Sequence, residues 1–489
     1  MSPATDSVIV TAVLELLAVI AHIAVIGVVL VTRRRDPSAT IAWILFIMVA
    51  PFVGALVYLA MGRTRIRRTA KRFSRAEATL RSVLSRHDLR GRLSERGGGW
   101  ADERTQAMVR LGDAIASTPA STGNATRALV NADATYREIT QAINQAGHHI
   151  HVEFYIIQPD AVGTGLRDLL TERAAAGVEV RVLCDAIGSN ALPSGFWAPL
   201  RKAGGHAAVF GPLSKFLPRW RRRDRVDFRN HRKIVVVDGR VGFTGGINVG
   251  KEYLGLDPSI GGWRDTHVRI EGTAVLSLQQ TFLRDWLMTT GEALGDEHYF
   301  PDCPAAGDCL VQVIDSGPDQ SWPSVEIYYT QAIALARERV WITSPYFIPS
   351  PVIESALTVA ALRGVDVRLL LPHKSDLRLV TLASHSYYAP LLHAGVRIFE
   401  YARGFVHAKT MVVDEWVTTI GSANMDMRSF NLNFELNVFV FGRQLGQDIG
   451  NQFCLDLKAA SEVRGEWERR MGLGRRLVRG FARLLSPLL

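Results

Sequence analysis

The strongest constraint on the fold of this chain is a pattern that occurs twice. Residues 231–248 read HRKIVVVDGRVGFTGGIN, and residues 407–424 read HAKTMVVDEWVTTIGSAN. In both segments a histidine, a lysine, an aspartate, a glycine and a final asparagine keep the same spacing, so that all five pairs of corresponding positions share one offset (407 − 231 = 409 − 233 = 414 − 238 = 421 − 245 = 424 − 248). Five coincident positions in so short a segment predict a duplicated domain, in which each copy supplies half of one site.

The sequence around these segments repeats as well. Residues 148–158 resemble residues 338–350, and residues 175–185 parallel residues 362–372. In the second pair a helical segment ends near a glycine and is followed by a strand rich in β-branched residues. This alternation predicts an α/β fold, with two tandem α/β/α sandwich domains related by a pseudo-two-fold axis.

Two apolar runs precede the repeat, at residues 8–31 and 39–61. Each is long enough, at 1.5 Å per residue, for a helix to cross a hydrocarbon core of about 30 Å. Because only the short segment TRRRDPS separates them, residues 1–62 are expected to form a membrane hairpin, with a re-entrant second segment or a buried soluble hairpin as alternatives. Basic residues flank the second run and favour a multi-pass protein whose catalytic domains lie in the cytoplasm.

The remaining boundaries follow from composition. Lysine and arginine outnumber aspartate and glutamate by 57 to 47, and the net charge of +10 predicts an anionic partner, either nucleic acid or a membrane surface. Residues 63–104 are interpreted as a basic juxtamembrane linker, and residues 105–300 and 301–455 as the two domains. Residues 456–489 form a basic amphipathic segment, which is either an interfacial helix or a plain packing helix.

The repeated histidines can divide the work of a displacement at phosphorus. Such a reaction needs a nucleophile on one side of phosphorus and a proton donor for the leaving oxygen on the other. A neutral histidine can attack and a protonated one can donate, so His231 and His407 would supply both functions if they face each other. On a regular strand Lys233 and Lys409 share the face of the histidines and would hold the phosphate oxygens.

The other repeated residues complete this candidate catalytic motif. Asn248 and Asn424 follow glycine-containing turns and can donate their amide N–H groups to phosphate oxygens. Asp238 and Asp414 lie an odd number of residues from the lysines, so on a strand they point away from the pocket. We interpret these two aspartates as structural anchors of the motif.

The two segments resemble the signature of the phospholipase D superfamily, HxKx4D followed by G(S/G)xN, which that family carries twice. The similarity covers about residues 105–445. It implies a reaction without metal or cofactor, in which one histidine forms a phosphohistidine and the other protonates the leaving alcohol and then deprotonates the acceptor. The N-terminal histidine is the family's usual nucleophile, which favours His231.

The same resemblance adds three residues to the site. The family places a carboxylate downstream of each motif to orient the histidine, and this sequence offers Asp265 downstream of His231 and Glu435 downstream of His407. Ser422 adds a hydroxyl to the phosphate site in the second copy only, since the first copy has a glycine there.

Longer stretches are similar to the bacterial cardiolipin synthases within this superfamily. They include GGINVGKEYLG, WRDTHVRIEG and GSANMDMRSFNLNFELN, together with the N-terminal apolar runs. The resemblance implies transfer of a phosphatidyl group between two phosphatidylglycerol molecules at the bacterial plasma membrane, with release of glycerol and no nucleic acid partner. A hydrolytic phospholipase D, a nuclease of the same superfamily and a scaffold with a degenerate site are the alternatives.

Overall fold

The computed structural model describes residues 19–20, 23–31, 37–50, 53–55, 58, 78–80, 82–83, 102–211, 228–257, 261–374, 377–464, 473–484 and 486. The chain divides into two compact units, one made of residues 1–71 and 214–225 and the other of residues 72–213 and 226–489. Both copies of the sequence repeat belong to the second unit.

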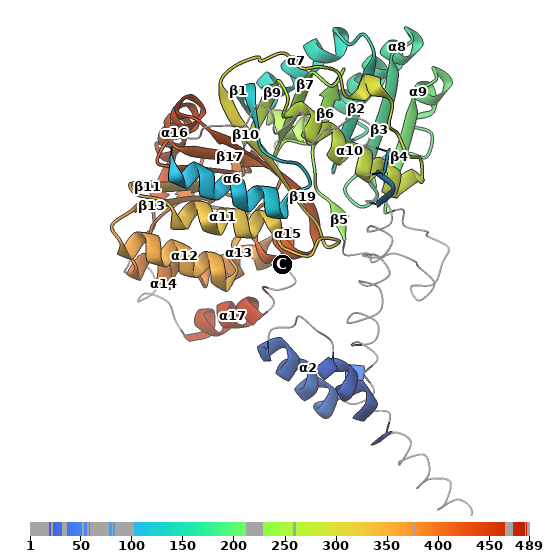
Figure 1. The fold of residues 1–489 in the computed structure, drawn as a ribbon. Helices are drawn as coiled ribbons and strands as arrows, with labels where there is room; N and C mark the ends of the chain where they lie inside the picture. The colour runs from blue at the N-terminus through green and yellow to red at the C-terminus, as the bar shows by residue number, and fades with distance from the viewer. Residues whose placement is uncertain are drawn as a thin grey trace, which may run out of the picture. The chain divides into compact units, whose positions relative to one another are not determined.

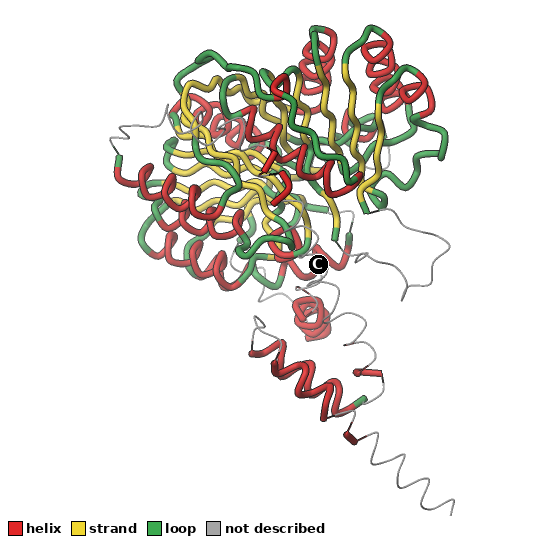
Figure 2. The backbone as a smooth tube through the Cα atoms, turned by 45° about the vertical axis from the view of Figure 1, so that its right-hand side comes forward, coloured by secondary structure: helices red, strands yellow, loops and turns green. Residues whose placement is uncertain are grey.

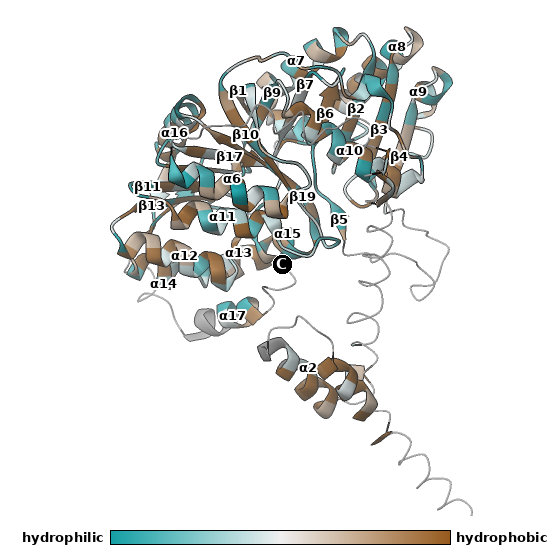
Figure 3. Cartoon of the chain, in the orientation of Figure 1, coloured by the Kyte–Doolittle hydropathy of each residue, from teal (hydrophilic) through white to brown (hydrophobic). Residues whose placement is uncertain are grey.

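The first unit contains the apolar helix α2 (Pro37–Val49), which Figure 3 colours as hydrophobic over most of its length. Val29, Ile47 and Tyr58 are buried together there, and Trp43 lies edge-on to Tyr58 with 5.3 Å between ring centroids. Within the described ranges, no helix is both long and apolar enough to cross a membrane. Much of the predicted hairpin and nearly all of the predicted linker lie outside those ranges, so both stay predictions.

In the second unit, α6 (Glu103–Ile115) precedes the first copy of the repeat (Figure 1). The elements of this copy are β1 (Ser121–Val130), α7 (Asn131–Asn144), β2 (His149–Phe154), α8 (Ala161–Ala175), β3 (Glu179–Asp185), α9 (Ala198–Lys202), β4 (His206–Phe210), β5 (Arg229–Asn230), β6 (Ile234–Val237), β7 (Val241–Gly245), η2 (Lys251–Leu254), β8 (Trp263–Arg264), β9 (Thr266–Glu271), α10 (Val275–Thr290) and η3 (Glu297–Tyr299).

The second copy follows the same plan, and α17 is the last helix that the structure describes. Its elements are β10 (Cys309–Ser316), α11 (Ser324–Ala334), β11 (Arg339–Thr343), β12 (Phe347–Ile348), α12 (Pro351–Leu362), β13 (Asp366–Pro372), α13 (Arg378–His385), α14 (Tyr388–His393), β14 (Arg397–Tyr401), β15 (Phe405–Val406), β16 (Thr410–Val413), β17 (Val417–Gly421), β18 (Met425–Asp426), α15 (Met427–Asn431), β19 (Asn433–Phe441), α16 (Arg443–Leu457), β20 (Ala460–Glu462) and α17 (Leu473–Leu484).

Of the described strands, 16 join in one mixed sheet (Figure 2), while β12 pairs with β18 and β15 with β8 in two separate two-stranded sheets. Outwards from its centre, the order β1-β9-β7-β6-β2-β3-β4 in the first copy mirrors β10-β19-β17-β16-β11-β13-β14 in the second. The central strands β1 and β10 pair antiparallel, with Ser121 opposite Val311. This arrangement confirms the predicted tandem α/β fold, whereas the borders assigned to the two domains stay a prediction.

Helices cover both faces of the sheet because strand side chains alternate between the faces. On β2, Ile150 and Val152 pack in a core with residues of α7, α8 and α9. The intervening His149 and His151 face α10 and bond to its Gln279. In the second copy α11 and α12 pack on one side of the sheet and α16 on the other.

A shared core joins the strands that follow the two histidines. Val236 of β6 and Val412 of β16 belong to one buried cluster, together with Val268 of β9 and Val438 of β19. The two motif segments are therefore held against each other by apolar packing between the copies. All four cysteines, Cys184, Cys303, Cys309 and Cys454, are free thiols.

Candidate active site

Each histidine follows a two-residue strand that pairs with the opposite copy. His231 comes directly after β5, which pairs with β19, and its backbone N–H donates to the carbonyl of Phe434 at 2.9 Å. His407 comes directly after β15, which pairs with β8, and its N–H donates to the carbonyl of Arg264 at 2.7 Å. Each copy thus fixes the backbone of the other copy's histidine.

The prediction of one continuous strand through the histidine and the lysine is wrong in detail. Residues 231–233 and 407–409 belong to no strand, and the regular ladders begin at Ile234 and Thr410. The ladder does not extend to the histidines because β5 and β15 pair with strands of the opposite copy. Both lysines nevertheless lie close to their histidines.

The orienting carboxylates pair with the histidines crosswise. The Nδ1 atom of His231 lies 3.1 Å from Glu435, and the Nδ1 atom of His407 lies 2.7 Å from Asp265. The expectation that each carboxylate serves the histidine of its own copy is therefore wrong. The reason is register: Asn230 stands opposite Phe434 and Val406 opposite Arg264, so the next residue in each chain segment is a histidine on one side and a carboxylate on the other.

Both carboxylates are fully buried. Burial by itself would raise the pKa of Asp265, but Lys409 and His407 outweigh it and lower that pKa. Burial would likewise raise the pKa of Glu435. The positive charge of His231 and Lys233 outweighs burial, so that pKa is lowered. Because an ionised carboxylate only accepts hydrogen bonds, each Nδ1 carries a proton, and the unprotonated Nε2 is the nucleophilic atom of the neutral ring.

The basic side chains of the motif lose affinity for protons by burial. Burial lowers the pKa of His231, lowers that of His407 to about 4 with help from Lys409, and lowers that of Lys233 to about 7. With the proton of His407 on Nδ1, Nζ of Lys409 donates to Nε2 of that ring at 3.0 Å, and Nζ of Lys233 donates to the carbonyl of His231 at 2.6 Å. An anionic phosphate beside these groups would raise all of these pKa values, because it stabilises the charged forms.

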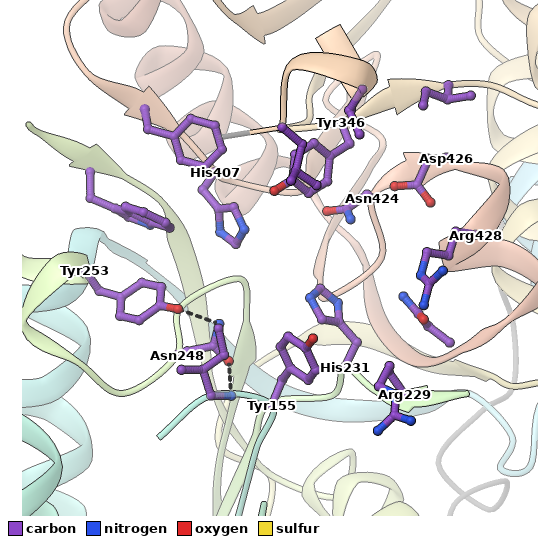
Figure 4. A pocket seen from close by; sticks show the side chains of 17 residues that line it. Tyr155, Arg229, His231, Asn248, Tyr253, Tyr346, His407, Asn424, Asp426 and Arg428 are labelled. Atoms are coloured by element: carbon purple, nitrogen blue, oxygen red, sulfur yellow. Dashed lines mark hydrogen bonds between the residues drawn. The ribbon is translucent and has the colours of Figure 1, made fainter. Parts of the chain in front are cut away.

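The two histidines face one pocket of about 520 Å³ between the copies (Figure 4). Asn248 and Asn424 also line it, and their binding of phosphate stays a prediction. The Oδ1 atom of Asn248 accepts from the N–H of Ile156 at 3.0 Å, and its Nδ2 donates to the hydroxyl of Tyr253 at 3.1 Å. The rest of the lining comprises Tyr155, Ile156, Arg229, Tyr253, Trp263, Tyr346, Ile348, Leu377, Val380, Phe405, Asp426, Arg428 and Asn433.

Ser422 and the two lysines do not line this pocket. The hydroxyl of Ser422 donates to Glu435 at 2.5 Å, and its oxygen accepts from the N–H of Leu436 at 2.9 Å. The serine is fully buried behind His231, so the prediction of a phosphate-binding hydroxyl is corrected to a group that holds Glu435. Lys233 and Lys409 are also buried behind the histidines, and a role in phosphate binding stays a prediction for them.

The two motif aspartates lie at the far ends of the strands that follow the histidines. Asp238 accepts backbone N–H groups from residues 147, 148 and 149 at 2.8 Å each. Asp414 does the same for residues 337, 338 and 339 at 2.8–2.9 Å, and it also accepts from Arg104. Both have left-handed backbones, with φ of 53° and 55°, which aspartate tolerates better than most residues. Neither lines the pocket.

Several residues at the site were missed from the sequence. The ring of Tyr155 lies 4.9 Å from that of His231, and the ring of Trp263 lies 5.0 Å from that of His407. Burial raises the pKa of Tyr155, and Arg229 and Arg428, which also line the pocket, oppose that rise without cancelling it. Tyr155 lies in one of the repeated segments, Arg229 in the basic run RWRRRDRVDFRNH before the first motif, and Arg428 in the stretch GSANMDMRSFNLNFELN, so each position carried a signal.

Arg232, between His231 and Lys233, is the largest fully buried side chain among the described residues. Its Nε donates to the carbonyl of Glu435 at 3.1 Å, and its Nη1 donates to Asp285 at 2.7 Å. The second copy has Ala408 at the position of Arg232, so this difference between the two copies was the signal in the sequence.

Where the structure describes the chain, no group of three or more His, Cys, Asp and Glu side chains is arranged to hold a metal ion.

The comparisons with known proteins agree with this geometry. The family described as "Cardiolipin synthase, PLD-like domain" matches residues 139–286 and 329–456, and that described as "Phospholipase_D-nuclease N-terminal" matches residues 19–63. Cardiolipin synthase 2 of Bacillus cereus is 41% identical over 468 residues, covering 95% of this chain and 89% of that protein. Cardiolipin synthase of Halalkalibacterium halodurans is 39% identical over 469 residues, covering 95% and 92%.

Among solved structures, phosphatidylserine synthase of Haemophilus influenzae has a TM-score of 0.57 and 14% identity. It covers 78% of this chain and 100% of its own, which shows a likeness of fold alone.

Proposed function

The chain belongs to the cardiolipin synthase family of the phospholipase D superfamily, and on that premise we propose that it joins two phosphatidylglycerol molecules into cardiolipin and glycerol. The observation that supports this most is the pair of crossed histidine–carboxylate contacts, which present two imidazoles to one pocket. One imidazole can attack phosphorus while the other handles the proton of the leaving or incoming oxygen.

The proposed reaction has two steps. In the first, Nε2 of one histidine forms a P–N bond, the P–O bond to glycerol breaks, and the other histidine gives its proton to the departing oxygen. In the second, that histidine takes the proton from a hydroxyl of the second phosphatidylglycerol, whose oxygen forms the new P–O bond as the P–N bond breaks. Because one phosphodiester replaces another, no oxidant, reductant or further energy source is needed. From the family we expect His231 to be the nucleophile.

The other motif residues have supporting roles in this proposal. Lys233 and Lys409 supply positive charge behind the histidines as the phosphate binds, and Asn248 and Asn424 donate amide N–H groups to its oxygens. Asp265 and Glu435 stabilise the imidazolium that forms in each step, since each carboxylate contacts a ring Nδ1.

Attachment to the membrane would favour transfer over hydrolysis. A phosphatidyl-enzyme keeps its acyl chains in the bilayer while water-soluble glycerol leaves, and a tethered site meets the second lipid at a high effective concentration. We propose that residues 1–62 form a membrane hairpin that makes the protein multi-pass, with both catalytic domains in the cytoplasm. The family match over residues 19–63 supports an N-terminal segment shared with relatives.

The decisive experiment supplies purified protein with phosphatidylglycerol alone, in mixed micelles without added metal. We expect cardiolipin and glycerol in equal amounts, with a His231→Ala/His407→Ala double variant as the inactive background. Phosphatidic acid with glycerol, and no cardiolipin, would instead identify a hydrolase. Absence of any lipid turnover would contradict both functions.

A further inference from the structure

The C-terminal helix α17 packs against α13 (Figure 1), and two of its apolar side chains are exposed. Phe481 and Leu484, three residues apart and therefore on one side of the helix, are 63% and 77% exposed. Ala482 between them is 1% exposed and belongs to the core of the second copy. A helix on a water-facing surface normally has the opposite arrangement.

Polar contacts hold this helix in its orientation. Arg479 lies 3.1 Å from Nδ1 of His385 at the end of α13. The guanidinium of Arg483 lies 4.8 Å from the ring of Tyr387, whose hydroxyl donates to Ser486 at 3.1 Å. The exposure of Phe481 and Leu484 is thus set by contacts on the inner side and flanks of the helix.

The neighbouring helix α13 extends the apolar surface to the mouth of the pocket. Leu377 and Leu379 are 52% and 38% exposed. Leu377 and Val380 also line the pocket that holds the two histidines. The exposed face of the α13–α17 pair, defined by Leu377, Leu379, Phe481 and Leu484, is therefore continuous with the wall of the site. We refer to it as the α13–α17 face.

Basic residues surround this face. Lys374, Arg378 and Arg483 are exposed there, and the sequence of α17 contains four arginines and no acidic residue. Apolar side chains combined with arginine and lysine are the composition of segments that lie in the interface of an anionic bilayer.

The size of a lipid substrate indicates what covers the α13–α17 face. A pocket of about 520 Å³ holds a molecule of drug size. A phospholipid acyl chain reaches across half of a hydrocarbon core, roughly 15 Å. If the substrate is a diacyl lipid, as the proposed function requires, its chains extend past the pocket, and the rim must meet hydrocarbon rather than water.

We propose that the α13–α17 face is the surface by which the catalytic unit docks on an anionic phospholipid bilayer, so that lipid substrates enter the pocket past Leu377. The face inserts Phe481 and Leu484 among the acyl chains near the headgroups, while the surrounding arginines and lysine contact lipid phosphates. This inference rests on the proposed function for the identity of the lipid, but it concerns a surface outside the catalytic residues.

A fluorescence experiment tests the insertion directly. In the full chain, Phe481→Cys in a Cys309→Ser/Cys454→Ser background carries an environment-sensitive dye, in vesicles of phosphatidylglycerol and phosphatidylcholine. We expect a blue shift and quenching by phosphatidylcholine spin-labelled on its acyl chains. The same dye on the native, exposed Cys454 of α16 is the control and should be quenched little.

Two results would overturn the docking surface. A dye at position 481 that stays in water in vesicles would make α17 a plain packing helix. A blue shift that requires no vesicles and grows with protein concentration would assign the face to a second copy of the chain.

An activity experiment separates docking from catalysis. We expect Phe481→Ser/Leu484→Ser to lower turnover of vesicle-bound phosphatidylglycerol by a factor of about ten or more, because two large apolar groups no longer reach hydrocarbon. Turnover of a short-chain, water-soluble phosphatidylglycerol should stay within about twofold of the unmodified chain, since the histidines are untouched. The matched control is Leu455→Ser on α16, a leucine that is 54% exposed, and both activities should be retained.

Equal loss of both activities in the Phe481→Ser/Leu484→Ser variant, or no loss of either, would contradict the docking surface. Failure of the unmodified chain to turn over either lipid would contradict the proposed function instead, and the fluorescence result would still decide the docking surface.

Discussion

Replacing Glu435 by glutamine tests the crossed geometry of the site most directly. Glutamine keeps the shape and a hydrogen-bond acceptor but removes the negative charge beside His231, whose Nδ1 lies 3.1 Å away. Asp265→Asn is the matched change beside His407, where the contact is 2.7 Å. Both carboxylates are fully buried, so solvent screens neither pair.

The expected size of the effect follows from these contacts. A buried hydrogen bond to a charged group contributes about 1.5–3 kcal/mol, which corresponds to about 1–2 pKa units. Burial already lowers the pKa of each histidine, and the carboxylate partly offsets this because it favours the imidazolium. Removing the carboxylate charge therefore lowers the pKa of the contacted histidine further. Because an imidazolium or a phosphorylated ring forms in each step of the proposed mechanism, the maximal rate should fall about 10- to 100-fold.

The assay is the pH dependence of kcat/KM for cardiolipin formation. The nucleophile must be neutral, so its pKa sets the acidic limb, and the acid must be protonated, so its pKa sets the basic limb. Trapping the phosphohistidine assigns one limb to each histidine. We expect Glu435→Gln to move the limb of His231 to lower pH, and Asp265→Asn to move that of His407. The reverse assignment, or a shift of the same limb by both variants, would refute the crossed pairing.

Other residues of the site give three further predictions. His231→Ala and His407→Ala should each abolish cardiolipin formation in the micelle assay, with acid-labile phosphate trappable on only one of the two histidines; a near-normal rate in either variant would contradict the mechanism. Gly246→Ala should lower kcat about 10- to 100-fold, because the new Cβ would lie 2.1 Å from the carboxylate that orients the second histidine. Gly195→Ala, which meets open space, is its control and should keep full activity. Asp414→Ala removes the acceptor of three backbone N–H groups and should lower the free energy of unfolding by about 2–4 kcal/mol in urea titrations, whereas an unchanged midpoint would show that the turn holds without it.

The repeat made much of the fold predictable. Matching positions at one constant offset predict two similar units, and the β-branched runs predict strands such as β3 and β13, which are present. The junction between the copies could not be predicted, because the pairing of β1 with β10 depends on contacts distant in sequence. The two-residue strands β5, β8 and β15 are too short to leave any periodicity in the sequence.

At the site, spacing identifies residue types but not partners. The pattern singles out Asp265 and Glu435, yet the nearest motif upstream of each is the wrong one, since strand pairing between copies decides which histidine lies beside which carboxylate. Ser422 shows the same limit: its place in the motif suggests the phosphate, while its burial and its bond to Glu435 turn it away from the pocket. A residue's place in a motif therefore gives its chemistry, and its direction comes from tertiary packing.

The crossed contacts predict that the two copies act only together. Neither copy contains a histidine with its own carboxylate, so each half alone lacks an oriented imidazole. The backbone plan is nearly symmetric, because Gly245 stands opposite His267 as Gly421 stands opposite Asn437, which places Asp265 and Glu435 at equivalent positions.

The side chains around these carboxylates break that symmetry. Glu435 accepts a hydrogen bond from the hydroxyl of Ser422. Asp265 lies instead against Gly246, where no side chain fits, and it accepts the N–H of Thr266 at 2.7 Å. The proposed reaction needs one neutral and one protonated histidine at the same moment, which two identical environments would not favour. A symmetric backbone with unequal partners brings both histidines to one pocket while letting their proton affinities differ.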